Sequence, residues 1–178
     1  MRSGADAMRR ALDSFYALTT LLAACCFVAV ALLVLYQLGG QLFPYVPRSA
    51  DEFAGYCMGA SAFLGLADAL RSGDHIRVTL VADRLAPRAK RAMQWLALSI
   101  GSALALWSAW YMLRMAWDSW VMNELSSGLI ALPMWLPQGA MAWGAVAFAL
   151  ALLELFPLLA AGADLPGPGD AEEFSADR

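Results

Sequence analysis

The charged residues of this chain are confined to short segments that separate long stretches containing none. Four stretches lack Asp, Glu, Lys and Arg altogether: residues 14–47, 53–67, 92–113 and 125–153. A helix needs roughly 20 apolar residues to cross the ~30 Å hydrocarbon core of a bilayer. The spacing therefore predicts an all-α membrane protein with four transmembrane helices.

The sequence places the four spans at about residues 14–38, 51–71, 91–113 and 134–156. The second span is short between its charges, but long charged side chains at its ends can reach the membrane surface. No other segment is long enough for a soluble domain, so residues 1–161 are predicted to form one four-helix transmembrane domain. Residues 162–178 combine acidic residues with Pro and Gly, which indicates a disordered, acidic cytoplasmic tail.

Basic residues predict the orientation of the spans. Six of the twelve Lys and Arg residues lie between the second and third spans, at residues 71–91, and three more precede the first span. In the loops on the opposite side, residues 39–50 and 118–132, the one basic residue is Arg48. Because Lys and Arg concentrate in cytoplasmic loops, both termini and residues 71–91 are predicted to be cytoplasmic.

Residues 74–86 within this basic segment allow two interpretations. Asp74 would cap a short helix with Val78 and Leu85 on one face, lying flat on the cytoplasmic leaflet. Alternating apolar and polar residues from Ile76 onward also fit a strand. We favour the interfacial helix, because an isolated strand beside a membrane has no pairing partner.

Local signals mark where the second and fourth helices begin. Ser49 followed by Glu52 predicts a capping box. In this motif the Ser49 side chain accepts a hydrogen bond from the Glu52 backbone N–H, and the Glu52 carboxylate accepts one from the Ser49 backbone N–H. The segment Pro133–Pro137 fits the entry or first turn of the fourth helix.

The third helix is expected to continue beyond its span into water. Arg114 and Asp118 are four residues apart and would pair on a helix. Trp and Tyr residues crowd this part of the chain between Trp107 and Trp120, which predicts an aromatic belt at the outer membrane surface.

Small residues recur at the spacing that lets membrane helices pack closely. Gly55 and Gly59 are four apart on the second span, and Gly101 lies in a similar run of small residues on the third. These glycines are candidate helix–helix contacts, although Ala and Gly are common enough in membrane helices for chance matches.

No catalytic, cofactor or metal site is expected. His75 is the single histidine, so the chain alone cannot hold a haem between two histidines, and a structural zinc site needs about four ligands. No charge lies near the middle of a span, where charges usually mark ion or substrate pathways. The chain is therefore expected to be neither an enzyme nor, by itself, a carrier of charged solutes, and nothing supports a nucleic-acid role.

Three segments together resemble a known family. The acidic pair Asp51-Glu52 opens the second helix, Arg71–Val78 follows that helix, and Leu132–Pro137 precedes the fourth. Over about residues 12–156 the chain resembles the DctQ-like small membrane subunit of tripartite ATP-independent periplasmic (TRAP) transporters.

The resemblance implies a bacterial inner-membrane protein that works with two partners. One is a large membrane subunit (DctM-like) that carries the transport path, and the other is a periplasmic solute receptor (DctP-like). Uptake would be driven by an ion gradient, usually of sodium, and the substrates would be mostly organic acids. The small subunit would bind no substrate and would act as a scaffold for the large subunit.

Candidate contacts with partners or lipids lie on both sides of the membrane. Asp51, Glu52 and Trp135 are predicted to face the periplasm, where they would contact the large subunit or the receptor; a helix cap and a loop turn are the alternative. His75 and Arg77 are predicted to be cytoplasmic, where Arg77 would pair with lipid phosphate or the large subunit.

Two other functions compete with this interpretation: a stand-alone small transporter or channel, and the membrane anchor of a redox complex.

Overall fold

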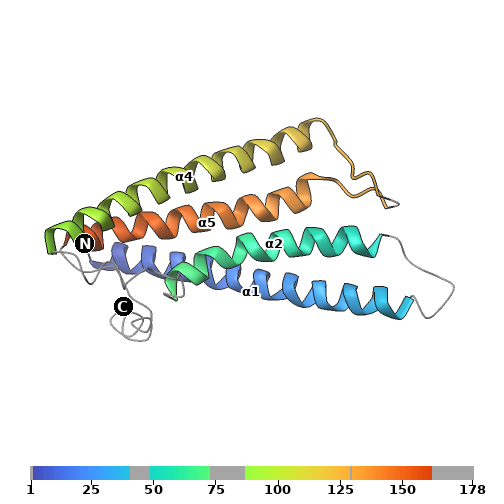
Figure 1. Cartoon of the computed structure of the whole chain (residues 1–178), viewed down its shortest axis with the longest axis horizontal. Helices are drawn as coiled ribbons and strands as arrows, with labels where there is room; N and C mark the ends of the chain where they lie inside the picture. The colour runs from blue at the N-terminus through green and yellow to red at the C-terminus, as the bar shows by residue number, and fades with distance from the viewer. Residues whose placement is uncertain (1, 41–48, 73–86, 129, 162–178) are drawn as a thin grey trace.

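The computed structural model of the chain describes residues 2–40, 49–72, 87–128 and 130–161. These residues form four long helices that run in alternating directions: α1 (Arg2–Gly40), α2 (Ala50–Arg71), α4 (Pro87–Val121) and α5 (Trp135–Ala160) (Figure 1). Each is long and apolar enough to span a membrane, which confirms the prediction of four helical spans. The predicted interfacial helix at residues 74–86 and the predicted tail at residues 162–178 lie outside the described residues.

Two helices extend well beyond the predicted spans. α1 begins at Arg2, twelve residues before the predicted start. α4 has 35 residues, a length of about 52 Å at ~1.5 Å per residue, so it continues beyond its span as expected. In this extension Arg114 and Asp118 form the predicted pair, with Nε and Oδ2 3.9 Å apart.

α5 also continues past its predicted end, reaching Ala160 although Pro157 lies inside it. A proline inside a helix removes one backbone hydrogen bond, but packing holds the last turn in place. Leu159 is 1% exposed, and its carbonyl oxygen accepts a hydrogen bond from Nη2 of Arg91 at 3.3 Å.

The predicted capping box at the start of α2 was wrong. Ser49 has helical backbone angles, φ −85° and ψ −14°, and its side chain makes no capping hydrogen bond. The Ser49 carbonyl still accepts a bond from the Phe53 backbone N–H at 3.3 Å. Glu52 turns instead toward Tyr56, whose hydroxyl donates to Glu52 Oε1 at 2.6 Å.

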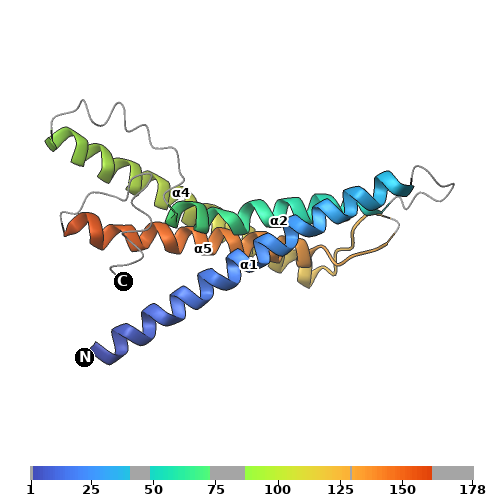
Figure 2. The same ribbon diagram turned by 90° about the horizontal axis from the view of Figure 1, so that it is seen from below.

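The helices lie in a row, in the order α1, α2, α5, α4 (Figure 1). α5 packs against α2 on one side and α4 on the other, and α1 packs mainly against α2. In the most apolar stretch of α5, 50% of the residues are buried, whereas 6% are buried in the corresponding stretch of α1. We call the end of the row where α1 begins and α5 ends the terminal end. We call the opposite end, where α4 and α5 are joined, the loop end. Figure 2 shows the first turns of α1 leaning away from the other helices at the terminal end.

α4 contacts α5 through one regular stripe. The buried residues of this stripe on α4 are Leu98, Ser102, Ala105, Ala109 and Ser119. The first four alternate in steps of four and three, the repeat that keeps one face of a helix against a neighbour. At the terminal end the contact is aromatic, since the rings of Trp95 and Phe156 are 6.0 Å apart. Apart from Arg91 and Trp120 near its ends, the remaining surface of α4 is mostly exposed.

The backbones of α2 and α5 lie in close contact at Gly144. A Cβ atom built there would overlap the backbone of Phe63 and lie 2.6 Å from the nitrogen of Leu64. The surrounding interface is built from small side chains, including Ala67 at 1% and Ala147 at 0% exposure. Small residues at such a crossing let the two backbones pack without intervening side chains.

Candidate partner-binding surfaces

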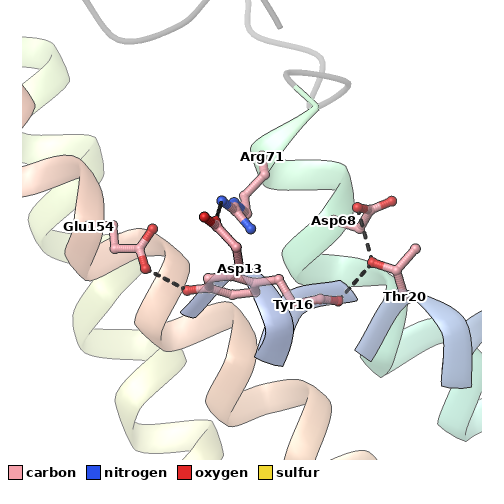
Figure 3. Close-up of polar contacts among 6 residues, drawn as sticks. All are labelled: Asp13, Tyr16, Thr20, Asp68, Arg71 and Glu154. Atoms are coloured by element: carbon pink, nitrogen blue, oxygen red, sulfur yellow. Dashed lines mark hydrogen bonds and ion pairs between the residues drawn. The ribbon is translucent and has the colours of Figure 1, made fainter. Parts of the chain in front are cut away.

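A polar cluster at the terminal end joins three helices (Figure 3). Arg71 at the end of α2 bonds Asp13 on α1, with Nη2 and Oδ1 2.9 Å apart. The Arg71 guanidinium also lies over the ring of Tyr16, 4.2 Å from its centroid. The Tyr16 hydroxyl then donates to Oε1 of Glu154 on α5 at 3.1 Å. These contacts link α1 to both α2 and α5 through one 4%-exposed tyrosine.

Threonines extend the same cluster along α1. The Thr20 hydroxyl lies 3.1 Å from Oδ1 of Asp68 and 3.0 Å from the Tyr16 carbonyl oxygen, and its single proton serves one acceptor at a time (Figure 3). Deeper in the row, Nε1 of Trp143 donates to Oγ1 of Thr19 at 3.1 Å. The carboxylates of Asp13, Asp68 and Glu154 are therefore each engaged within the chain.

The α4–α5 loop at the loop end (residues 122–128 and 130–134 among those described) is tied together internally. Leu125 pairs with Pro133 in an isolated β-bridge. The Ser126 N–H donates to the Leu132 carbonyl at 2.8 Å, and the Ser119 hydroxyl donates to Oε2 of Glu124 at 2.6 Å. The turn after α4 requires a positive backbone angle at Asn123, φ 51°, which Asn tolerates better than most residues.

Glu52 anchors this loop to the start of α2. Its carboxylate lies directly against Gly128, where any side chain would collide with it. The Tyr56 hydroxyl donates to Glu52 and also lies 3.5 Å from the sulfur of Met134. Gly128 is therefore required by the close approach of the loop to α2, and Glu52 serves an intramolecular contact.

The other predicted contacts at the loop end differ in their surroundings. Asp51 is exposed beside Glu52. Trp135 packs on Trp120, with ring centroids 4.7 Å apart in an edge-to-face arrangement. Trp135 thus joins the ends of α4 and α5, whereas Asp51 leaves its carboxylate accessible. His75 and Arg77 lie outside the described residues.

The three candidate glycines take different positions. Gly59 faces α5, where an added Cβ would lie 3.2 Å from the flexible Sδ of Met141. Gly55 and Gly101 have open space at the Cβ position. The sequence prediction missed Gly144, where α5 crosses α2 in backbone contact. The signal available for it was a run of small residues on the fourth span, with Ala140, Ala147 and Ala151 at helical spacing from it.

Metal binding has no geometric support in the part of the chain that the structure describes. No group of three or more His, Cys, Asp or Glu side chains there is arranged to hold a metal ion.

Comparison with known families gives a match over most of the chain. The family described as "Tripartite ATP-independent periplasmic transporters, DctQ component" matches residues 41–160, a range that includes all of α2, α4 and α5. No curated protein matches the chain.

Proposed function

Because this chain belongs to the DctQ family of TRAP transporter components, we propose that it is a scaffold for the large membrane subunit during ion-driven uptake of organic acids. The family consists of transporter components and is not a family of enzymes, and the chain is a multi-pass membrane protein. Its partners in a tripartite system are a large membrane subunit and a periplasmic receptor.

The observation that carries the scaffold role is the distribution of charge in the described helices. Charged side chains are absent between Glu52 and Asp68 of α2, and between Arg91 and Arg114 of α4. In α5 the charged residue is Glu154, which lies toward the terminal end and accepts the Tyr16 hydroxyl. A charged solute crossing the bilayer needs polar or charged groups at its midplane, so we assign that pathway to the large subunit.

We propose that the terminal end lies on the cytoplasmic side of the bacterial inner membrane. Among the described side chains, this end carries Arg10, Arg71, Arg88, Lys90 and Arg91. The loop end carries Arg114, which pairs with Asp118. The excess of basic residues at one end supports this orientation through the positive-inside tendency, and it leaves Asp51 exposed toward the periplasmic receptor.

Co-purification tests the subunit role. The tagged chain is expressed with the large membrane subunit and the receptor, solubilised in mild detergent and purified. We expect the large subunit to co-purify in a fixed ratio. A chain that purifies alone, with the large subunit present in the same membranes, would contradict the proposal.

Reconstitution tests the transport role. Proteoliposomes containing both membrane subunits, with receptor and a labelled organic acid outside, should accumulate label when an inward sodium gradient is imposed. Vesicles prepared without this chain serve as the control and should lose most of the uptake. Equal uptake with and without the chain would remove the scaffold role, and equal uptake with a potassium gradient would remove sodium coupling.

A further inference from the structure

One flank of α4 carries large apolar side chains that the described part of the chain leaves largely exposed, although Trp120 at its end also contacts Trp135. Its members are Leu106, Trp110, Leu113, Trp117 and Trp120, which we call the aromatic seam. They follow one another in steps of four and three residues, so they share one face of the helix. Their exposures run from 46% to 67%. This face is distinct from the buried stripe through which α4 contacts α5.

The position of the aromatic seam along α4 indicates that lipid tails cannot cover all of it. Arg91 bonds the last turn of α5, and we take its charged guanidinium to mark the edge of the hydrocarbon on this side. Counting ~1.5 Å per residue from Arg91, Trp110 lies about 28 Å and Trp120 about 43 Å along the helix. A tilt of ~20° shortens these distances by less than a tenth. The hydrocarbon core is ~30 Å thick, so the far half of the seam lies outside it.

A membrane-surface belt accounts for only part of the seam. The headgroup layer on each side is about 5–8 Å thick, whereas Trp110 and Trp120 are about 15 Å apart along the axis. The exposed apolar surface also continues into the α4–α5 loop, where Met122 is 70% and Leu125 60% exposed. Tryptophans at a single headgroup level would not extend over this depth.

α1 provides an internal comparison. Its exposed large apolar side chains extend from Leu18 to Leu38, about 30 Å along the helix, which equals the thickness of the hydrocarbon core. They are mainly aliphatic, with Phe27 and Tyr36 as the aromatic exceptions. Lipid tails therefore suffice to cover α1, and they do not suffice for α4.

The exposed area is large enough for a stable protein contact. At their exposures of 66%, 67% and 55%, the three tryptophans alone present roughly 450 Å². That is more than half of the ~800 Å² that each partner contributes to a standard-size interface. The pair Arg114–Asp118 lies beside the seam and supplies the polar rim that such interfaces have.

We propose that the aromatic seam of α4 binds a transmembrane helix of the large membrane subunit, an inference that rests on the proposed function. The partner must cover α4 inside the bilayer and follow it about 10 Å beyond the hydrocarbon. Lipid tails cover only the inner part, and a soluble receptor reaches only the outer part. An integral membrane protein whose helices also extend past the bilayer covers both.

Photo-crosslinking tests the contact in the assembled complex. Benzoylphenylalanine replaces Trp110 or Trp117, and the matched control replaces Phe27 on α1, which is 69% exposed. We expect both α4 positions to crosslink to the large subunit and the α1 position to crosslink only to lipid. Crosslinks from the α4 positions to lipid alone, to the receptor or to a second copy of this chain would overturn the inference. Crosslinks to the large subunit from Phe27 as strong as those from Trp117 would do the same.

Substitution gives an independent measurement. The double variant Trp110→Ala/Trp117→Ala should weaken co-purification of the large subunit by about tenfold or more, as loss of anchoring tryptophans does at other interfaces. Phe27→Ala should leave it unchanged. If the wild-type chain fails to retain the large subunit, the proposed function itself fails. If wild type and double variant retain it equally, only the assignment to the aromatic seam fails.

Discussion

At the scale of single residues, two glycines allow close contacts between elements, each at a different place in the fold. Gly144 allows the backbones of α2 and α5 to touch, and Gly128 allows the α4–α5 loop to rest on the Glu52 carboxylate. Gly55 and Gly101, which the sequence favoured, have free space where a side chain would be. Spacing along a helix identifies small residues but does not specify which face meets a neighbour, so the sequence did not single out Gly144, whereas the predicted Gly59 does face α5.

Replacing Gly144 should therefore destabilise the fold strongly. Gly144→Leu is expected to lower the free energy of unfolding by about 3 kcal/mol, because an overpacked crossing forces the backbones apart. Gly55→Leu is the control and should have little effect, since nothing lies within 4 Å of its Cβ position. Denaturant unfolding of the detergent-solubilised protein measures both, and equal losses would show that α2 and α5 do not cross at Gly144.

Glu52 should control the order of the α4–α5 loop. Glu52→Ala removes the acceptor of the Tyr56 hydroxyl and the carboxylate against which Gly128 packs. Amide exchange at residues 122–128 should become faster, while Asp51→Ala at the exposed neighbouring position should leave it unchanged. Unaltered exchange in the Glu52 variant would mean that the loop is held by its own bonds alone.

At the scale of elements, α1 packs mainly against α2, and it reaches α5 through Tyr16 and through the bond between Thr19 and Trp143. The Tyr16 hydroxyl reaches Glu154 on α5, and its ring supports the Arg71 guanidinium (Figure 3). The charge gaps of the sequence predicted the number of helices and the approximate position of each. They did not predict this cluster, because it depends on how α1 is rotated against α2 and α5.

Tyr16→Phe isolates the hydroxyl from the ring. The variant should lose about 1 kcal/mol of stability, the usual net value of one hydrogen bond, while the ring keeps its contact with Arg71. Tyr36→Phe, at a position that is 58% exposed on the same helix, is the control. Thermal unfolding of the two purified variants compares them, and identical midpoints would show that the bond to Glu154 contributes nothing.

The stripe through which α4 contacts α5 contains a buried hydroxyl group that forms no hydrogen bond with the described residues. Ser102 is 4% exposed, and its hydroxyl has no hydrogen-bond partner among the described residues. Ser102→Ala should raise the free energy of unfolding by up to about 1 kcal/mol, because it removes a buried unsatisfied group. Ser108→Ala on the exposed face of α4 should be neutral. A clear loss of stability in the Ser102 variant would show that the hydroxyl is hydrogen-bonded within the folded protein and would contradict this prediction.

At the scale of the whole molecule, the row of helices presents two long edges, α1 and α4 (Figure 1). The edges differ in composition, since α4 has 35 residues and carries exposed tryptophans toward the loop end, whereas the exposed apolar side chains of α1 are mainly aliphatic. The sequence showed the crowding of aromatic residues but assigned it to a membrane-surface belt. The helix length and the exposed fractions show how far the crowding extends along α4, and the proposed contact with the large subunit rests on that extent.

The orientation of the row can be tested directly. Green fluorescent protein fused to the C-terminus should fluoresce, because it folds in the cytoplasm and not after export through the general secretion pathway. Alkaline phosphatase inserted after Ser127 in the α4–α5 loop should be active, because it requires the periplasm. The reverse pattern would place the terminal end outside and overturn the orientation derived from Lys and Arg.

The order of the row also has a consequence for how the chain is made. α5 is synthesised after the other three helices, yet it is the one that contacts both α2 and α4. Before α5 is made, α1 and α2 can pair as a hairpin, but α4 lacks the helix against which it packs in the described residues. A product truncated before Trp135 would therefore contain the hairpin and α4 without the helix that packs between them.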